Sequence, residues 1–170
     1  MGITNKILVF LTALFSKKVA LILIAALPIF ELRLSVPLGI IKFQLPPWEV
    51  FFLSILGNML PVIPLLLFLR WAVVRLEHIK GIGKFLKWWF DRAEKKSKAV
   101  ETYGFWGLVI LVAIPLPGTG AWTGCAAATL FNFKLPKALL AIFLGVIIAG
   151  VIMVFGSNGL YGVLPQLNSH

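Results

Sequence analysis

Two ionisable residues, Glu31 and Arg33, stand two positions apart inside an otherwise apolar run at residues 19–41. A charge at the centre of a membrane-spanning helix costs about 2.5–3.5 kcal/mol unless it finds a partner or water. A straight helix turns by about 100° per residue and would point one of the two toward lipid. We therefore expect broken backbone around Glu31-Leu32-Arg33. Pro28 and Pro37 favour such a break, because each removes an amide donor and disfavours a helical conformation at the preceding residue.

This charged pair has two interpretations. Glu31 is either a carboxylate that binds and releases a proton or a cation, or a structural partner of Arg33 or of the opposite backbone. Arg33 is always charged. It either holds an anionic head group or keeps Glu31 ionised.

A second apolar run, 104–131, exceeds the roughly 20 residues of one membrane span and is interrupted at its midpoint by Pro115-Leu116-Pro117-Gly118-Thr119-Gly120. We expect its arms, Gly104–Ile114 and Ala121–Phe131, to form a re-entrant hairpin. Irregular backbone at membrane depth is tolerated only where protein buries it or where it lines a wet cavity. We therefore expect this bend and Glu31 to meet inside the protein.

The bend also precedes a predicted helix N-terminus near Ala121. The backbone amides there lie at the positive end of the helix dipole and suit an anion, or Glu31 itself. Trp122 and Thr123 flank the bend. Trp122 is either a packing group or a group that stacks on substrate.

Asn58 stands one turn before Pro61. Its amide either donates to the carbonyl of Gly57, which the proline leaves without its usual partner, or faces the cavity. The candidate binding residues are Glu31, Arg33, Asn58, Pro115, Pro117, Gly118, Thr119, Gly120, Trp122 and Thr123. One cysteine and two histidines lack the spacing of a metal site, and the apolar runs hold no nucleophile with a base. We expect no metal, no cofactor and no enzymatic chemistry.

The composition places these residues in a membrane protein. Of the 170 residues, 60% are hydrophobic and 13% are charged, whereas a soluble domain has about 45–50% and about 25%. An ordinary soluble domain is therefore excluded. The net charge of +10 comes from Lys and Arg that lie mostly at the ends of apolar runs. This placement is typical of topology signals and of contacts with anionic lipids, and we expect no nucleic-acid binding.

We expect a single membrane domain over residues 1–170. Its segments are an interfacial helix at 3–18, a re-entrant hairpin at 19–41, a transmembrane helix at 50–69, a basic amphipathic segment at 70–103, a second re-entrant hairpin at 104–131, a transmembrane helix at 138–156 and an uncharged tail at 157–169. A short extra span is the alternative for 3–18. Residues 70–103 hold nine Lys and Arg against four Asp and Glu, which predicts a cytoplasmic location.

Short matches relate the two halves of the chain. Phe43-Gln44-Leu45-Pro46 corresponds to Phe133-Lys134-Leu135-Pro136, and Ala26-Leu27-Pro28 corresponds to Ala113-Ile114-Pro115. The positive-inside rule gives the halves opposite orientations, as in inverted-repeat transporters with sites at mid-membrane. The fold class that we expect is an all-α integral membrane protein of two inverted repeats, joined by the basic helix. Lys17-Lys18 would lie on the outer side, against the rule.

Three motifs carry a resemblance to a known family. They are Glu31-Leu32-Arg33 with Pro37-Leu38-Gly39, then Gly57-Asn58-Met59-Leu60-Pro61, and finally Ile114-Pro115-Leu116-Pro117-Gly118-Thr119-Gly120-Ala121-Trp122-Thr123-Gly124. Through them, residues 20–150 resemble the small multi-drug export protein family of prokaryotic membranes. That family is similar to the DedA (VTT) superfamily, for which paired re-entrant hairpins and lipid translocation are expected. DedA-type proteins carry ionisable residues at both hairpins, whereas the second hairpin here has none.

These observations predict a secondary transporter of a small or amphipathic substrate, coupled to protons through Glu31, in a prokaryotic cytoplasmic membrane. The alternatives are a lipid flippase or scramblase and a membrane assembly component in which Glu31 and Arg33 are structural. Small residues on helix faces suggest a homodimer.

Overall fold

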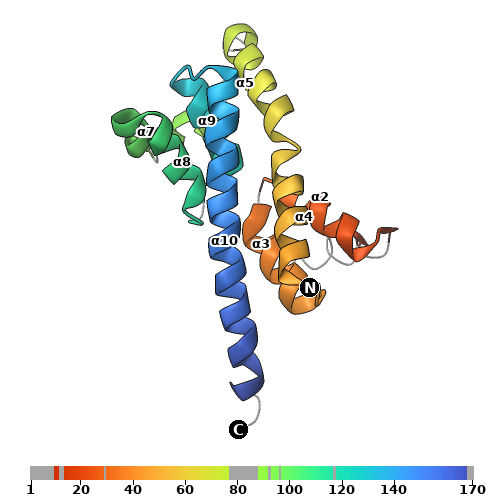
Figure 1. Cartoon of the computed structure of the whole chain (residues 1–170). Helices are drawn as coiled ribbons and strands as arrows, with labels where there is room; N and C mark the ends of the chain where they lie inside the picture. The colour runs from red at the N-terminus through yellow and green to blue at the C-terminus, as the bar shows by residue number, and fades with distance from the viewer. Residues whose placement is uncertain are drawn as a thin grey trace. The chain divides into compact units, whose positions relative to one another are not determined.

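The computed structural model describes residues 10–11, 14–28, 30–76, 88–91, 93–95, 97–116 and 118–167. Within these residues every element is a helix (Figure 1): α2 (Lys17–Ala26), α3 (Glu31–Pro37), the π-helix η1 (Leu38–Lys42), α4 (Pro47–Met59), α5 (Val62–Leu76), α7 (Lys98–Tyr103), α8 (Phe105–Ala113), α9 (Ala121–Leu130) and α10 (Leu135–Leu167). The prediction of an all-α protein is confirmed for this part of the chain. Most of the interfacial helix expected at 3–18 lies outside the described residues, as does 77–87 of the basic segment.

The chain divides into two compact units, described here one at a time. The first unit consists of Met1–Asn58 and Gly150–His170, and the second of Met59–Ala149. Helices α2, α3, η1 and α4 belong to the first unit, and α5, α7, α8 and α9 belong to the second. Helix α10 contributes its first part to the second unit and its remainder to the first.

Prolines end one helix in each unit at corresponding points of the sequence. Leu27 precedes Pro28 and has an extended backbone, with ψ at 137°. Ile114 precedes Pro115 and is extended too, with ψ at 116°. The proline ring disfavours the helical conformation at the residue before it, and α2 and α8 both end there. The helix–break–helix order predicted for 19–41 and 104–131 is present, and its immersion in a membrane as re-entrant hairpins stays a prediction.

The break expected around Glu31-Leu32-Arg33 lies earlier in the chain than predicted, between the end of α2 at Ala26 and the start of α3 at Glu31. Helix α3 begins at Glu31, runs through Arg33 and contains Pro37. The chain then continues as η1, and the N–H of Leu38 donates to the carbonyls of Leu34 and Ser35. Pro37 has no N–H to donate to the helix. The π-type turn that follows changes the hydrogen-bond register, so the helical path continues past the proline.

Two stretches have the length and composition to cross a membrane: Pro47–Val73, with 27 residues, and Leu135–Gly159, with 25. They contain the predicted spans 50–69 and 138–156. The first is divided by a turn at Leu60 and Pro61.

Two details of these stretches correct the sequence-based expectation. Pro64 stands three residues after Pro61, and this spacing predicts that it repeats the break there. It does not, because it occupies the first turn of α5, where a backbone N–H has no intrahelical partner in any case. The tail expected at 157–169 is helical as far as Leu167, because this apolar sequence continues α10 without a proline or charge that would stop it before Pro165.

Outward-facing apolar residues recur along α4 at helical spacing. Trp48, Phe52 and Leu56 stand four residues apart and are exposed, whereas Val50 and Ser54 between them are buried. An exposed apolar stripe of this kind is typical of a surface that faces lipid.

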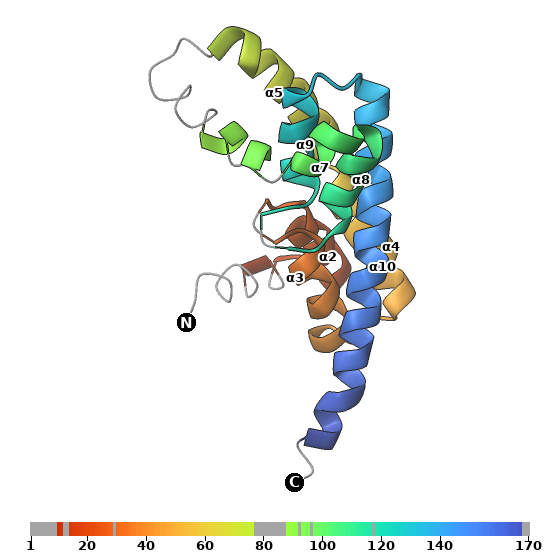
Figure 2. The same cartoon turned by 90° about the vertical axis from the view of Figure 1, so that its left-hand side faces the viewer.

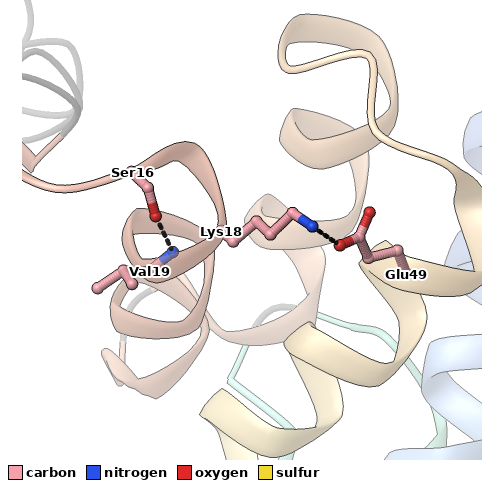
Figure 3. Close-up of polar contacts among 4 residues, drawn as sticks. All are labelled: Ser16, Lys18, Val19 and Glu49. Atoms are coloured by element: carbon pink, nitrogen blue, oxygen red, sulfur yellow. Dashed lines mark hydrogen bonds and ion pairs between the residues drawn. The ribbon is translucent and has the colours of Figure 1, made fainter.

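The N-termini of α2 and α4 are joined by an ion pair (Figure 3). The ammonium of Lys18 contacts the carboxylate of Glu49, and the hydroxyl of Ser16 accepts a hydrogen bond from the N–H of Val19 at 3.4 Å. Lys18, whose expected outer location opposes the positive-inside rule, therefore has an acidic partner in the same unit.

In the second unit, glycines let helices pack closely. In both views α8 lies alongside the first part of α10 (Figures 1 and 2). A Cβ added to Gly145 would lie 2.6 Å from the Cβ of Val112, and one added to Gly124 would lie 2.6 Å from a methyl carbon of the same valine. Ala141, Gly145 and Ala149 stand four residues apart, a spacing that predicts a packing face, and all three are buried. This face therefore does not support the predicted homodimer, which stays a prediction.

Gly57 has the same part in the first unit and yields a test. A Cβ at Gly57 would lie 2.3 Å from the carbonyl oxygen of Ile22 in α2. We expect Gly57→Ala to lower the free energy of unfolding by about 1–3 kcal/mol, because backbone must move to relieve the overlap. Denaturant-induced loss of helical circular dichroism in detergent measures it.

Gly156→Ala in α10 is the matched control, since a Cβ there meets nothing within 4 Å. Alanine is a better helix former than glycine, so this variant should gain up to about 1 kcal/mol. Equal stabilisation of both variants would contradict the close contact between α2 and α4.

Candidate functional site

Helices α3 and α4 of the first unit carry four buried polar side chains. Glu31 is 5% exposed, Ser35 and Ser54 are each 0% exposed, and Asn58 is 1% exposed. We call these four residues the polar column. Glu31 and Ser35 stand one turn apart on α3, and Ser54 and Asn58 stand one turn apart on α4.

The register between the two helices is set by two contacts. The hydroxyl of Ser35 donates to the hydroxyl oxygen of Ser54 at 2.9 Å. One turn further along the chain from Ser35, a Cβ added to Gly39 would lie 2.8 Å from both methyl carbons of Val50. Moving four residues forward, from Ser35 to Gly39, thus corresponds to moving four residues back along α4, from Ser54 to Val50. The two segments therefore run antiparallel here, and the same register continued by four residues on each helix would bring Glu31 level with Asn58.

Asn58 has no hydrogen-bond partner for either polar side-chain atom among the described residues. The predicted bond to the carbonyl of Gly57 is therefore wrong. In a helix the side chains tilt toward the N-terminus while the carbonyls point toward the C-terminus, so the amide of Asn58 is directed away from that carbonyl. A buried polar group left without a partner costs about 1–3 kcal/mol of stability. This cost marks Asn58 as a candidate for binding a hydrogen-bond partner in another state of the protein.

Glu31 combines burial with an unusual backbone conformation. Its φ is 46°, in the left-handed region that side chains with a Cβ rarely adopt. Such a conformation costs about 1–2 kcal/mol and is concentrated at functional positions. Arg33 is half-buried, and its guanidinium interacts electrostatically with the carboxylate of Glu31. The two charges of the apolar run therefore interact, and Glu31 does so from a strained position at the start of α3.

In the second unit, the bend at 115–120 uses its own hydroxyls to hold its shape. The hydroxyl of Thr119 lies 2.6 Å from the carbonyl oxygen of Ile114 and 2.7 Å from that of Leu116. Thr123 donates to the carbonyl of Gly118 at 3.0 Å. Two of the bend's positions need glycine, because φ is 80° at Gly118 and 111° at Gly120. Pro117 lies outside the described residues.

Trp122 packs against another tryptophan. Its ring and that of Trp89 have centroids 6.2 Å apart and planes tilted by 34°. This aromatic contact supports the packing interpretation of Trp122. Pro115 lies at the extended segment that ends α8, as its sequence predicts.

The candidate residues thus fall into two groups. Glu31, Arg33 and Asn58 belong to the first unit, and the bend with Trp122 belongs to the second. That the two groups meet stays a prediction. Sequence reasoning missed Ser35 and Ser54, although their four-residue spacing from Glu31 and from Asn58 was a usable signal.

The fold and the buried column define a helical membrane protein. Two stretches are long and apolar enough to cross a membrane, and the carboxylate of Glu31 is buried. Residues 31–152 match the family described as "Putative small multi-drug export protein". The chain belongs to this family, and the matched region includes the polar column and the bend at 115–120. A search of curated proteins found no match, and a search of solved structures found none. The similarity to the DedA superfamily stays a prediction.

The serine pair of the column can be tested by a double-mutant cycle. Ser35→Ala and Ser54→Ala should each lower the free energy of unfolding by about 1 kcal/mol, because each leaves the other hydroxyl buried without its bond. The double variant should lose less than the sum, with a coupling of about 0.5–1.5 kcal/mol. Combining Ser54→Ala with Ser97→Ala is the control, because Ser97 bonds to Ala93 in the second unit. Strict additivity in the first cycle would contradict the register.

The hydroxyl of Thr119 yields a second stability test. Thr119→Val keeps the shape of the side chain but leaves the carbonyls of Ile114 and Leu116 without this donor. We expect a loss of about 1–2 kcal/mol in the free energy of unfolding. Thr102→Val is the control, since Thr102 donates to the carbonyl of Lys98, one turn back within helical α7, and closes no bend. Similar losses in both variants would contradict a bend closed by Thr119.

Proposed function

We propose that this chain is a proton-coupled exporter of small or amphipathic molecules in a prokaryotic cytoplasmic membrane. Membership of the export family supports transport. The observation that carries the proposal is Glu31, a carboxylate 5% exposed between apolar helices. Ionisable groups at such depth are expensive and are typically retained in ion pathways and proton relays.

The column gives this carboxylate the surroundings that a proton carrier needs. Arg33 stabilises the ionised form by charge attraction. Protonation removes that attraction and frees the guanidinium, which has five donors, to bind a polar or anionic part of a substrate. In this proposal, uptake of one proton by Glu31 lets Arg33 exchange its carboxylate partner for the substrate. The bend at 115–120 and Trp122 supply the remaining proposed substrate contacts.

Topology and lipid contacts complete the proposal. The basic segment 70–103 faces the cytoplasm and contacts anionic lipid head groups, as its excess of positive charge favours. The two helical breaks enter the membrane from opposite sides as inverted re-entrant hairpins. The corresponding ends of α2 and α8, at Leu27 and Ile114, support this arrangement locally.

Reconstituted vesicles test the function. The purified chain is placed in vesicles with an imposed pH gradient and a fluorescent amphipathic cation, and uphill accumulation of the dye is followed. We expect Glu31→Gln to reduce this accumulation at least tenfold, because the amide cannot exchange a proton. Glu49→Gln is the matched control and should retain transport, since Glu49 pairs with Lys18 at the helix N-termini.

Other outcomes separate the alternatives. Flip of a dithionite-sensitive labelled lipid without a gradient, unchanged in Glu31→Gln, would support a lipid scramblase instead. Loss of folding in both Glu31→Gln and Arg33→Ala, with neither transport nor lipid flip in the wild type, would support an assembly component.

A further inference from the structure

Asn58 holds a buried amide whose hydrogen-bonding capacity is unused in the described part of the chain. The side chain is 1% exposed, and neither its oxygen nor its nitrogen has a partner among the described residues. An amide offers one acceptor oxygen and two donor hydrogens. The missing partner must therefore supply a donor and an acceptor at the same place.

The serines of the column do not supply them. Ser35 and Ser54 hydrogen-bond to each other, one turn away from Asn58. The antiparallel register is set by that bond and by the contact of Gly39 with Val50. Continued by four residues on each helix, it would bring Asn58 to the level of Glu31. Glu31 is thus the side chain of the column whose chemistry can match both halves of the amide.

The match depends on the protonation state of Glu31. An ionised carboxylate has only acceptors and is served by the guanidinium of Arg33. A neutral carboxylic acid has one O–H donor and one carbonyl acceptor. Its O–H can donate to the oxygen of Asn58 while its carbonyl accepts from the amide nitrogen, so two hydrogen bonds close a ring between acid and amide.

We propose that Asn58 is the docking partner of protonated Glu31. The Glu31 carboxyl lies with Arg33 when it is ionised and turns to Asn58 when it has taken up a proton. The only covalent bond that forms or breaks in this exchange is the O–H bond of the carboxyl. The inference rests on the proposed function only in treating Glu31 as the group that binds the proton, and it assigns Asn58 as a positioning residue.

The other charged groups on the surrounding elements lie toward the ends of the helices. Helix α2 carries Lys17 and Lys18 at its N-terminus, where Lys18 pairs with Glu49 of α4. Lys42 ends η1. Residues 150–167 of α10 contain no Asp, Glu, Lys or Arg. Along α3, Arg33 is the charged neighbour of Glu31, so the exchange is between Arg33 and Asn58.

Infrared spectroscopy tests the exchange without any transport assay. The chain in lipid nanodiscs is titrated with pH, and the carbonyl stretch of neutral carboxyl groups is recorded. The Glu31 band is the one lost in Glu31→Gln. In Asn58→Leu this band should move to higher frequency, because the acid loses its hydrogen bonds, and its midpoint should fall by about one pH unit. In Arg33→Gln the midpoint should rise, because the ionised form loses its partner.

Asn158→Leu is the matched control, since Asn158 is exposed on α10 in the same unit, and it should leave the band unchanged. Asn58→Ser retains a single hydroxyl and should give a smaller frequency shift, which keeps the test decisive if Asn58→Leu does not fold. An identical band in wild type, Asn58→Leu and Asn58→Ser would overturn the docking role. A Glu31 band that responds to Asn58 in a chain without uphill transport would overturn the exporter and leave the docking pair standing.

Discussion

The antiparallel contact between α3 and α4 is the constraint on which the first unit depends. Two buried helices that carry polar side chains in an apolar setting must find a register that pairs those side chains. The hydrogen bond between Ser35 and Ser54 provides that register. Gly39 makes it sterically available, because a larger residue would overlap Val50. Every functional argument about Glu31 and Asn58 follows from this one alignment.

Small residues have a corresponding part in the second unit. Gly124 and Gly145 let α9 and α10 approach Val112 of α8. Hydroxyls and a cation then satisfy carbonyls at the turns, since Thr119 closes the bend after α8 and Arg70 donates to the carbonyl of Phe133. The N–H of Phe133 bonds to the carbonyl of Ala128 at 2.9 Å.

The first unit has the same local bond between Phe43 and Leu38, also at 2.9 Å. Both phenylalanines begin the motif that the two halves of the sequence share. The two copies of this motif therefore share a local backbone hydrogen bond. The repeat itself and the opposite orientation of its halves stay predictions.

The sequence by itself determined the helical class, the ends of α2 and α8, and the position of the buried charge. These features are local: a proline restricts the residue before it, and a long apolar run predicts a membrane helix. The same rule failed at Pro37, because the π-helical turn that follows it compensates for the lost donor. Only the tertiary structure decided that Ser35 meets Ser54 and that the amide of Asn58 does not bond to the carbonyl of Gly57. Those relations depend on which faces of two helices pack together, and packing is set by contacts between residues far apart in the chain.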